Sequence, residues 1–138
     1  MRLLLVLLTL PVSVFAADLR DMAEVKALTD QVMARIVKDD IKGAFGLLKP
    51  YWAGLPEAEM EVAMNKLLDQ RRLVAPRFGK TVGSVFVDQK TVADSVGYLL
   101  YIEKFEKHII RWHFYFYRPK ERWHLNSFTF DDRVQALF

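Results

Sequence analysis

The stretch IIRWHFYFYRPKERWHLNSFTF at residues 109–130 decides the fold of this chain. Two runs rich in aromatic and β-branched residues, 109–117 and 123–130, flank a turn-like segment. Such runs around a short polar connection are typical of a β-hairpin. A turn around residues 118–121 sets Tyr117 opposite Arg122. The register that follows pairs Phe116 with Trp123, Phe114 with Leu125 and Trp112 with Ser127.

This register gives the hairpin one apolar face and one mixed face, because side chains alternate between the two faces of a strand. The apolar face is the predicted core side and holds Trp112, Phe114, Phe116 and Leu125. The mixed face combines rings with hydrogen-bonding groups, namely Arg111, His113, Tyr115, Tyr117, His124, Asn126 and Phe128. A solvated outer face, the wall of a ligand pocket and a partner surface would all have this composition.

Two further strand-like segments, 81–88 and 95–105, precede the hairpin, and the short connections between all four predict an antiparallel meander. The register of the middle hairpin stays open. A two-residue turn at Glu106 and Lys107 places Leu99 and Tyr101 on the core face. A three-residue turn at 105–107 places Tyr98 and Leu100 there instead, since a slip of one residue exchanges the faces.

The first half of the chain is predicted to be helical. Over residues 19–37 apolar side chains recur at steps of three and four, the period of an amphipathic helix, and Asp18 is the expected N-cap. Asp40 is expected to cap a second helix over 41–49. Pro56 suits the first position of a third helix.

Arg71 and Arg72 suit the C-terminal end of this third helix, and the pattern changes to strands after Pro76. Helices followed by strands predict an α+β fold, with the N-terminal helices packed on one face of a four-stranded antiparallel sheet.

The layout resembles the nuclear transport factor 2-like superfamily, also called the cystatin-like α+β cone. The resemblance is carried by the helix at 19–37, FGLLKPYW at 45–52 and WHLNSFTF at 123–130. It implies a curved, cone-like sheet with a site in its mouth, between the concave face and the helices. Many members insert a strand among the N-terminal helices, and none is evident before Thr81, so a shallower cone is expected. The superfamily includes isomerases, dehydratases, ligand binders and assembly modules, so fold alone fixes no function.

The N-terminal MRLLLVLLTLPVSVFAA is typical of a secretory signal peptide, with Arg2, an apolar run and a cut after Ala16. We therefore expect residues 1–16 to be a signal peptide and 17–138 a single α+β domain that is periplasmic or secreted. The chain has no cysteine, so we expect neither disulfides nor a lipid anchor on cysteine. We also expect no stable membrane anchor, because the N-terminal apolar run is too short to span a bilayer and no second long apolar run follows it. The net charge of only +3 and the export signal argue against nucleic acid as a partner.

The leading functional hypothesis is a non-enzymatic exported domain that binds a small apolar or amphipathic ligand, or a partner protein, through its curved sheet. Its expected binding residues are Tyr98, Tyr101, Arg111, His113, Tyr115 and His124. No catalytic residue, metal site or cofactor is expected. His113 and His124, as diagonal neighbours on one face, could hold a metal with a carboxylate, but no recognisable ligand spacing supports this.

Two alternatives remain. An acid–base isomerase or dehydratase would use His113 or Glu103 as its base and a tyrosine as donor. However, Glu103 beside Lys104 is typical of an exposed cross-strand charge, and Asp131 with Asp132 is typical of a solvated turn. A homodimerisation module would pair the open sheet face with its copy. Three observations distinguish these hypotheses. An enclosed pocket with a buried Glu103 or His113 beside a tyrosine favours catalysis, and an apolar pocket favours ligand binding. A filled interior with an exposed aromatic outer face favours assembly.

Overall fold

A computed structural model describes residues 18–138, so the predicted signal peptide lies outside the described residues. Three helices come first: α1 (Met22–Val37), α2 (Ile41–Leu48) and α3 (Glu57–Phe78). Four strands follow: β1 (Thr81–Val92), β2 (Val96–Phe105), β3 (Ile109–Tyr117) and β4 (His124–Asp131). Short 3-10 helices follow α2 and β4: η1 (Lys49–Tyr51) and η2 (Val134–Leu137). No helix within 18–138 has the length and apolar character needed to cross a membrane.

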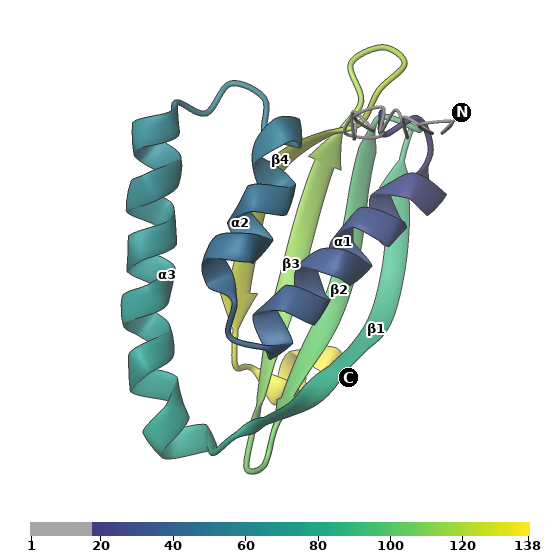
Figure 1. The fold of residues 1–138 in the computed structure, drawn as a ribbon. Coiled ribbons are helices and arrows are strands. Elements are labelled where there is room, and N and C mark those ends of the chain that lie inside the picture. Colours follow the sequence, from purple (N-terminus) through teal and green to yellow (C-terminus); the bar gives the residue numbers. More distant parts are fainter. Residues whose placement is uncertain (1–17) are drawn as a thin grey trace, which may run out of the picture.

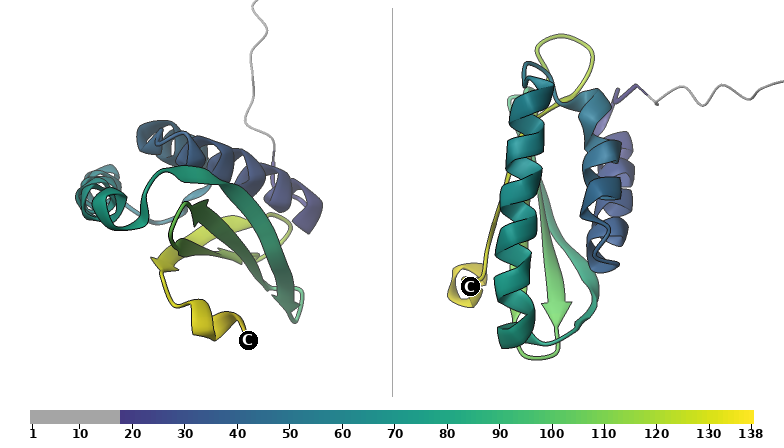
Figure 2. Two further views of the ribbon diagram at one scale, coloured as in Figure 1. Left: turned by 90° about the horizontal axis from the view of Figure 1, so that it is seen from below. Right: turned by 60° about the vertical axis from the view of Figure 1, so that its left-hand side comes forward.

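The predicted α+β fold is confirmed. The strands form one curved antiparallel sheet in the order β1-β2-β3-β4. α1 and α2 cover one face of this sheet, while α3 runs along its β4 side (Figure 1). η2 lies on the opposite face, which we call the outer face (Figure 2).

Local chemistry sets the helix starts. α1 begins three residues later than predicted, because Asp21 rather than Asp18 is its N-cap and accepts a hydrogen bond from the Glu24 N–H at 2.8 Å. The Asp40 cap of α2 is confirmed, since its carboxylate accepts from the Gly43 N–H at 3.0 Å.

α3 extends beyond the predicted end at Arg72 and includes Pro76 in its last turn. A proline there removes only one hydrogen bond near the helix end, where few turns remain to be disrupted. The helix stops at Gly79, whose φ of 80° suits a residue without a side chain. Pro56 is the N-cap residue rather than the first helical one.

The predicted register of the last hairpin is wrong. Phe116 pairs with Leu125, whereas Phe114 pairs with Phe128 and Trp112 with Phe130. Tyr117 pairs with His124 instead of Arg122. The connection is longer than predicted because the Trp123 N–H leaves the hairpin and donates to the Leu19 carbonyl at 2.7 Å.

The pairing of β4 with β3 also shifts by one residue between Tyr115 and Phe116. The β4 side chains beyond this shift therefore lie on the face opposite to the predicted one. Phe128 therefore lies on the core face and not on the outer face. Its ring centroid lies 5.6 Å from that of Phe45 and 5.5 Å from that of Trp52.

The middle hairpin has the two-residue turn at Glu106 and Lys107, closed by the Phe105 N–H donating to the His108 carbonyl at 2.9 Å. Leu99 accordingly pairs with Phe114, and Tyr101 with Trp112. The core side predicted for the last hairpin is also confirmed, because its four members are at most 1% exposed: Trp112, Phe114, Phe116 and Leu125.

Candidate functional site

The interior between α1, α2 and the sheet is filled. The cavity there has a volume of about 10 Å³ and is bounded by side chains such as Val32, Phe45, Leu67 and Trp112. A space of roughly 10–15 Å³ is needed for even one water molecule. No ligand fits between α1, α2 and the sheet, which is part of the region where the resemblance implied a site.

A buried ion pair lies deep on the core face. Glu103 on β2 is 0% exposed, which corrects the expectation of an exposed charge. Its Oε1 and Oε2 accept hydrogen bonds from Nη2 and Nη1 of Arg71 at 3.0 and 3.1 Å. The indole N–H of Trp112 also donates to Oε2, at 3.0 Å. Both carboxylate oxygens therefore already accept hydrogen bonds, within a part of the core that solvent does not reach.

Arg71 connects three parts of the fold. Besides Glu103, its guanidinium donates to the Asp39 carboxylate at 2.9 Å and to the Ile36 carbonyl at 3.2 Å. Burial alone would lower the pKa of Arg71, but the hydrogen bonds and charges of Glu103 and Asp39 outweigh it and raise the pKa. The side chain thus stays charged and joins α3 to the end of α1 and to the sheet.

The outer face holds a second polar cluster, a hydrogen-bonded chain of four side chains. Tyr98 Oη lies 2.8 Å from His113 Nδ1, and His113 Nε2 lies 3.2 Å from Asp131 Oδ2. Arg111 donates to both Asp131 oxygens at 2.7 Å. Asp131, expected in a solvated turn, instead holds β3 and β4 together on this face.

The charges of this cluster compensate one another. Burial favours the protonated form of Asp131, but the hydrogen bonds of Arg111 and the Arg133 N–H hold its pKa at about 2. Burial lowers the pKa of His113, and the positive charge of Arg111 lowers it further. The Asp131 carboxylate raises this pKa but does not outweigh the other two. Burial also raises the pKa of Tyr98. At neutral pH the cluster therefore contains an Arg–Asp ion pair, a neutral histidine and a neutral tyrosine.

The structure brings together four of the six predicted binding residues: Tyr98, Arg111, His113 and Tyr115. The Tyr115 ring lies 5.3 Å from the Tyr98 ring. Tyr101 does not join them, because the short turn places it on the core face, where its hydroxyl contacts Thr29 at 2.8 Å and Asp30 at 2.6 Å.

His124 lies apart from this cluster, at the start of β4. It pairs with Tyr117, whereas His113 pairs with Thr129, so the two histidines are not the diagonal neighbours expected from the sequence. Within residues 18–138, no group of three or more acidic or histidine side chains could hold a metal ion.

The sequence analysis did not predict the roles of Arg71 and Asp131. For each of them, strand alternation or register indicates that a partner of opposite charge is required. Once Leu99 and Tyr101 face the core, alternation puts Glu103 there too, and a buried carboxylate requires a cation. Asp131 follows from the correct register, in which it directly faces Arg111.

The outer face is partly covered by the C-terminal segment. Arg111 Nη1 donates to the Ala136 carbonyl at 3.4 Å, and the Arg133 N–H donates to Asp131 at 3.0 Å. Arg111 and His113 are consequently only 5% and 8% exposed. The cluster serves to anchor η2, and both ring nitrogens of His113 are already occupied.

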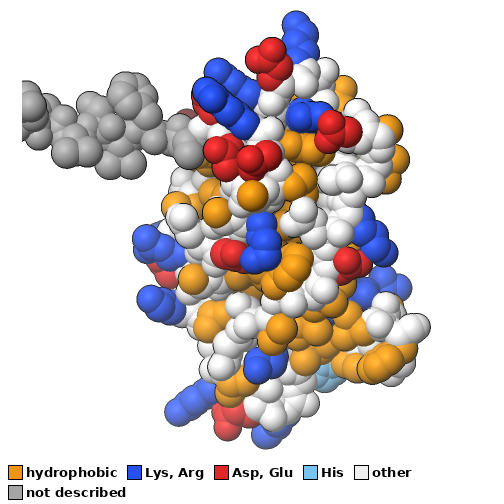
Figure 3. Space-filling model, turned by 90° about the vertical axis from the view of Figure 1, so that its right-hand side faces the viewer, with side chains coloured by type: hydrophobic (Ala, Val, Ile, Leu, Met, Phe, Trp, Pro, Cys, Tyr) orange, Lys and Arg blue, Asp and Glu red, His pale blue; other side chains and the backbone are white. Residues whose placement is uncertain are grey.

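Exposed apolar side chains gather on the β1 side of the molecule instead. Five valines of β1 and the start of β2 are 41–67% exposed: Val82, Val85, Val87, Val92 and Val96. Figure 3 shows hydrophobic side chains on this side of the surface, interrupted by single charges.

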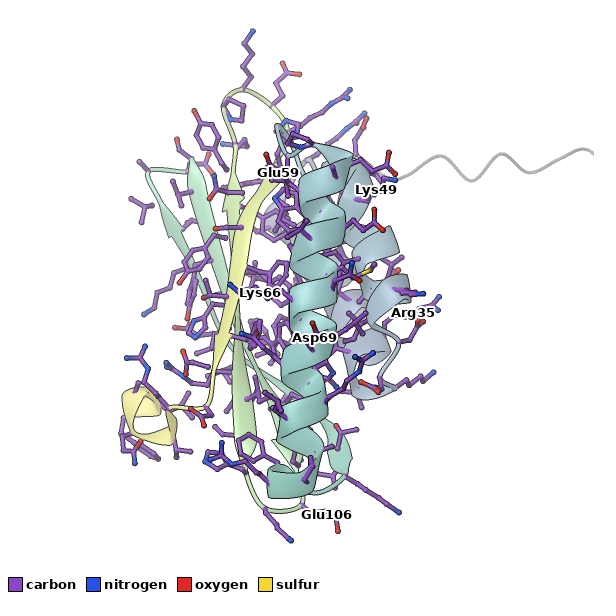
Figure 4. The ribbon with its side chains drawn as sticks, turned by 90° about the vertical axis from the view of Figure 1, so that its left-hand side faces the viewer. Arg35, Lys49, Glu59, Lys66, Asp69 and Glu106 are labelled. Atoms are coloured by element: carbon purple, nitrogen blue, oxygen red, sulfur yellow. The ribbon has the colours of Figure 1, made fainter. Side chains whose placement is uncertain are left out.

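α3 borders open grooves. The largest, of about 700 Å³, runs between its C-terminal half and the start of β1. Its lining combines apolar side chains with charges of both signs, among them Leu68, Val74, Phe105, Arg72, Lys80, Asp39 and Glu106. The rest of the helix presents charged residues such as Glu59, Lys66 and Asp69 (Figure 4).

No protein-family model matches this chain, and no curated protein or solved structure matches it either. The resemblance to the nuclear transport factor 2-like superfamily therefore stays a prediction that rests on the order of the elements.

Proposed function

We propose that this chain is a non-catalytic, exported assembly domain that binds a second copy of itself on the β1 side of its curved sheet. The filled interior carries the proposal, since a cavity of about 10 Å³ leaves no room for a ligand or substrate between α1, α2 and the sheet. Both candidate bases are also occupied. The carboxylate of Glu103 is shared by Arg71 and Trp112, and His113 is bonded through both ring nitrogens.

Binding then has to use an outside surface, and the β1 side suits a protein better than the others. Exposed apolar side chains at a sheet edge favour pairing with another chain. The five valines on this side are accompanied by Asp88 and Lys90, whose charges cancel. Two copies can therefore approach each other there without net repulsion, as an interface between identical surfaces requires. The groove along α3 is the place left for a small amphipathic ligand.

Sedimentation velocity over a concentration series tests this function. We expect the sedimentation coefficient of the wild-type protein to rise with concentration. Val87→Lys places a charge on the 41%-exposed β1 position and should keep the protein monomeric, because an edge lysine opposes strand pairing.

Val62→Lys is the matched control, since Val62 is 68% exposed but lies on α3. This variant should associate like the wild type. A wild-type protein that stays monomeric throughout, or equal effects of the two lysines, would overturn the proposed function.

A further inference from the structure

β1 is an edge strand with a free side. β2 bonds one side of β1, and within residues 18–138 no other element forms backbone hydrogen bonds with the opposite side. The Val92 carbonyl accepts from the Ser95 N–H at 3.0 Å and so points toward the hairpin. Because backbone groups alternate along a strand, those of Thr91 and Gln89 point to the free side. The Gln89 N–H, which has no strand partner, donates to its neighbour Asp88 at 2.8 Å.

The regular part of this edge is short. A register shift between Phe86 and Asp88 interrupts β1, and the strand ends at Val92. Pairing with another strand is therefore centred within 88–92, where two charged residues stand two positions apart. Asp88 and Lys90 lie on the same face, with their charged atoms 3.3 Å apart.

These charges discriminate between arrangements of two copies. When identical antiparallel strands continue a sheet about a two-fold axis, one residue faces its own copy, because opposed side chains share a face. A centre at Asp88 or Lys90 sets like charges directly opposite each other, which is unfavourable. A centre at Gln89 instead sets each Asp88 opposite the Lys90 of the other copy.

We propose that two copies of this chain pair their β1 strands antiparallel about Gln89 and so form one continuous sheet of eight strands. This inference rests on the proposed function and specifies its interface.

Cysteine cross-linking tests the register in a protein that has no cysteine of its own. Gln89→Cys sets the two thiol-bearing residues directly opposite, at a Cα–Cα distance of about 5.5 Å, within the range of a disulfide. Thr91→Cys is the matched control. It lies two residues further along the same free side, and its two copies would be roughly 13 Å apart along the strands.

Under mild oxidation at a concentration where the wild type associates, we expect Gln89→Cys to form covalent dimers and Thr91→Cys to remain monomeric on a non-reducing gel. Preferential cross-linking of Thr91→Cys, or of neither variant, would overturn the register while leaving the proposed function intact. A wild type that never associates would overturn both.

Charge reversal provides a second readout that needs no oxidation. Lys90→Asp sets two pairs of carboxylates opposite each other and should weaken association about tenfold or more. The double variant Asp88→Lys with Lys90→Asp restores opposite charges and should associate as the wild type does. If the double variant is as weak as the single one, the pairing about Gln89 is contradicted.

Discussion

Replacing Arg71 with methionine is expected to lower the free energy of unfolding by about 3–5 kcal/mol, the usual cost of removing one partner of a buried ion pair. The cause is Glu103, which is 0% exposed and would retain only the indole N–H of Trp112. Urea unfolding followed by circular dichroism measures this loss. It should appear as a midpoint lower by roughly 1–5 M, given a slope of about 1–3 kcal/mol per M of urea for small proteins.

Arg72→Met is the control for this variant. Arg72 is the next residue on α3, its side chain is 77% exposed, and its partner Asp69 is equally exposed to solvent. Its loss should change stability by no more than about 0.5 kcal/mol. Equal losses of stability in the two variants would show that the charge of Arg71 is not needed to compensate the buried Glu103 carboxylate.

The double variant Arg71→Met with Glu103→Gln separates charge from packing. It removes the uncompensated carboxylate and keeps an oxygen for Trp112, so most of the lost stability should return. A double variant as unstable as Arg71→Met would instead assign the loss to the packing of α3.

The second large effect is expected at Phe128. Phe128→Ala should destabilise the protein by about 2–3 kcal/mol, somewhat less than the ~3–5 kcal/mol of a fully buried phenylalanine. Its ring centroid lies 5.6, 5.5 and 6.1 Å from those of Phe45, Trp52 and Trp112. Thermal or urea unfolding of the variant gives the value directly.

Tyr117→Ala is the matched aromatic control, because Tyr117 is 48% exposed at the end of β3. It should cost less than about 1 kcal/mol. The register predicted from the sequence places both rings on the outer face and expects similar small losses. A small loss for Phe128→Ala would therefore contradict the observed register of β4.

The sequence predicted three strands to within one residue, because alternation is local, whereas β1 runs to Val92 and so past its predicted end at residue 88. Trp112, Phe114 and Phe116 stand at every second position of β3, so the core face follows from three residues. The partner register of β4 was not accessible in this way. It depends on Trp123 bonding to Leu19, which is distant in the chain, and on one register shift in β4.

The site was harder to predict than the fold. Arg71 and Glu103 are 32 residues apart, and no spacing in the sequence joins a residue of α3 to one of β2. Tyr101 was predicted to lie on the binding surface because the sequence left the length of the turn in the middle hairpin undecided. A slip of one residue decides which face Tyr101 lies on. The free side of β1 likewise becomes visible only when the strand order is known.

Hydrogen–deuterium exchange of the wild-type protein at low and high concentration tests the central claim, that the β1 side of the sheet is the contact surface, most directly. Backbone N–H groups without a strand partner exchange rapidly, and pairing with a second chain protects them. We predict that peptides covering residues 86–92 gain protection as concentration rises, whereas peptides from α3 do not change. Protection that is independent of concentration, or that appears on α3 instead, would contradict the account.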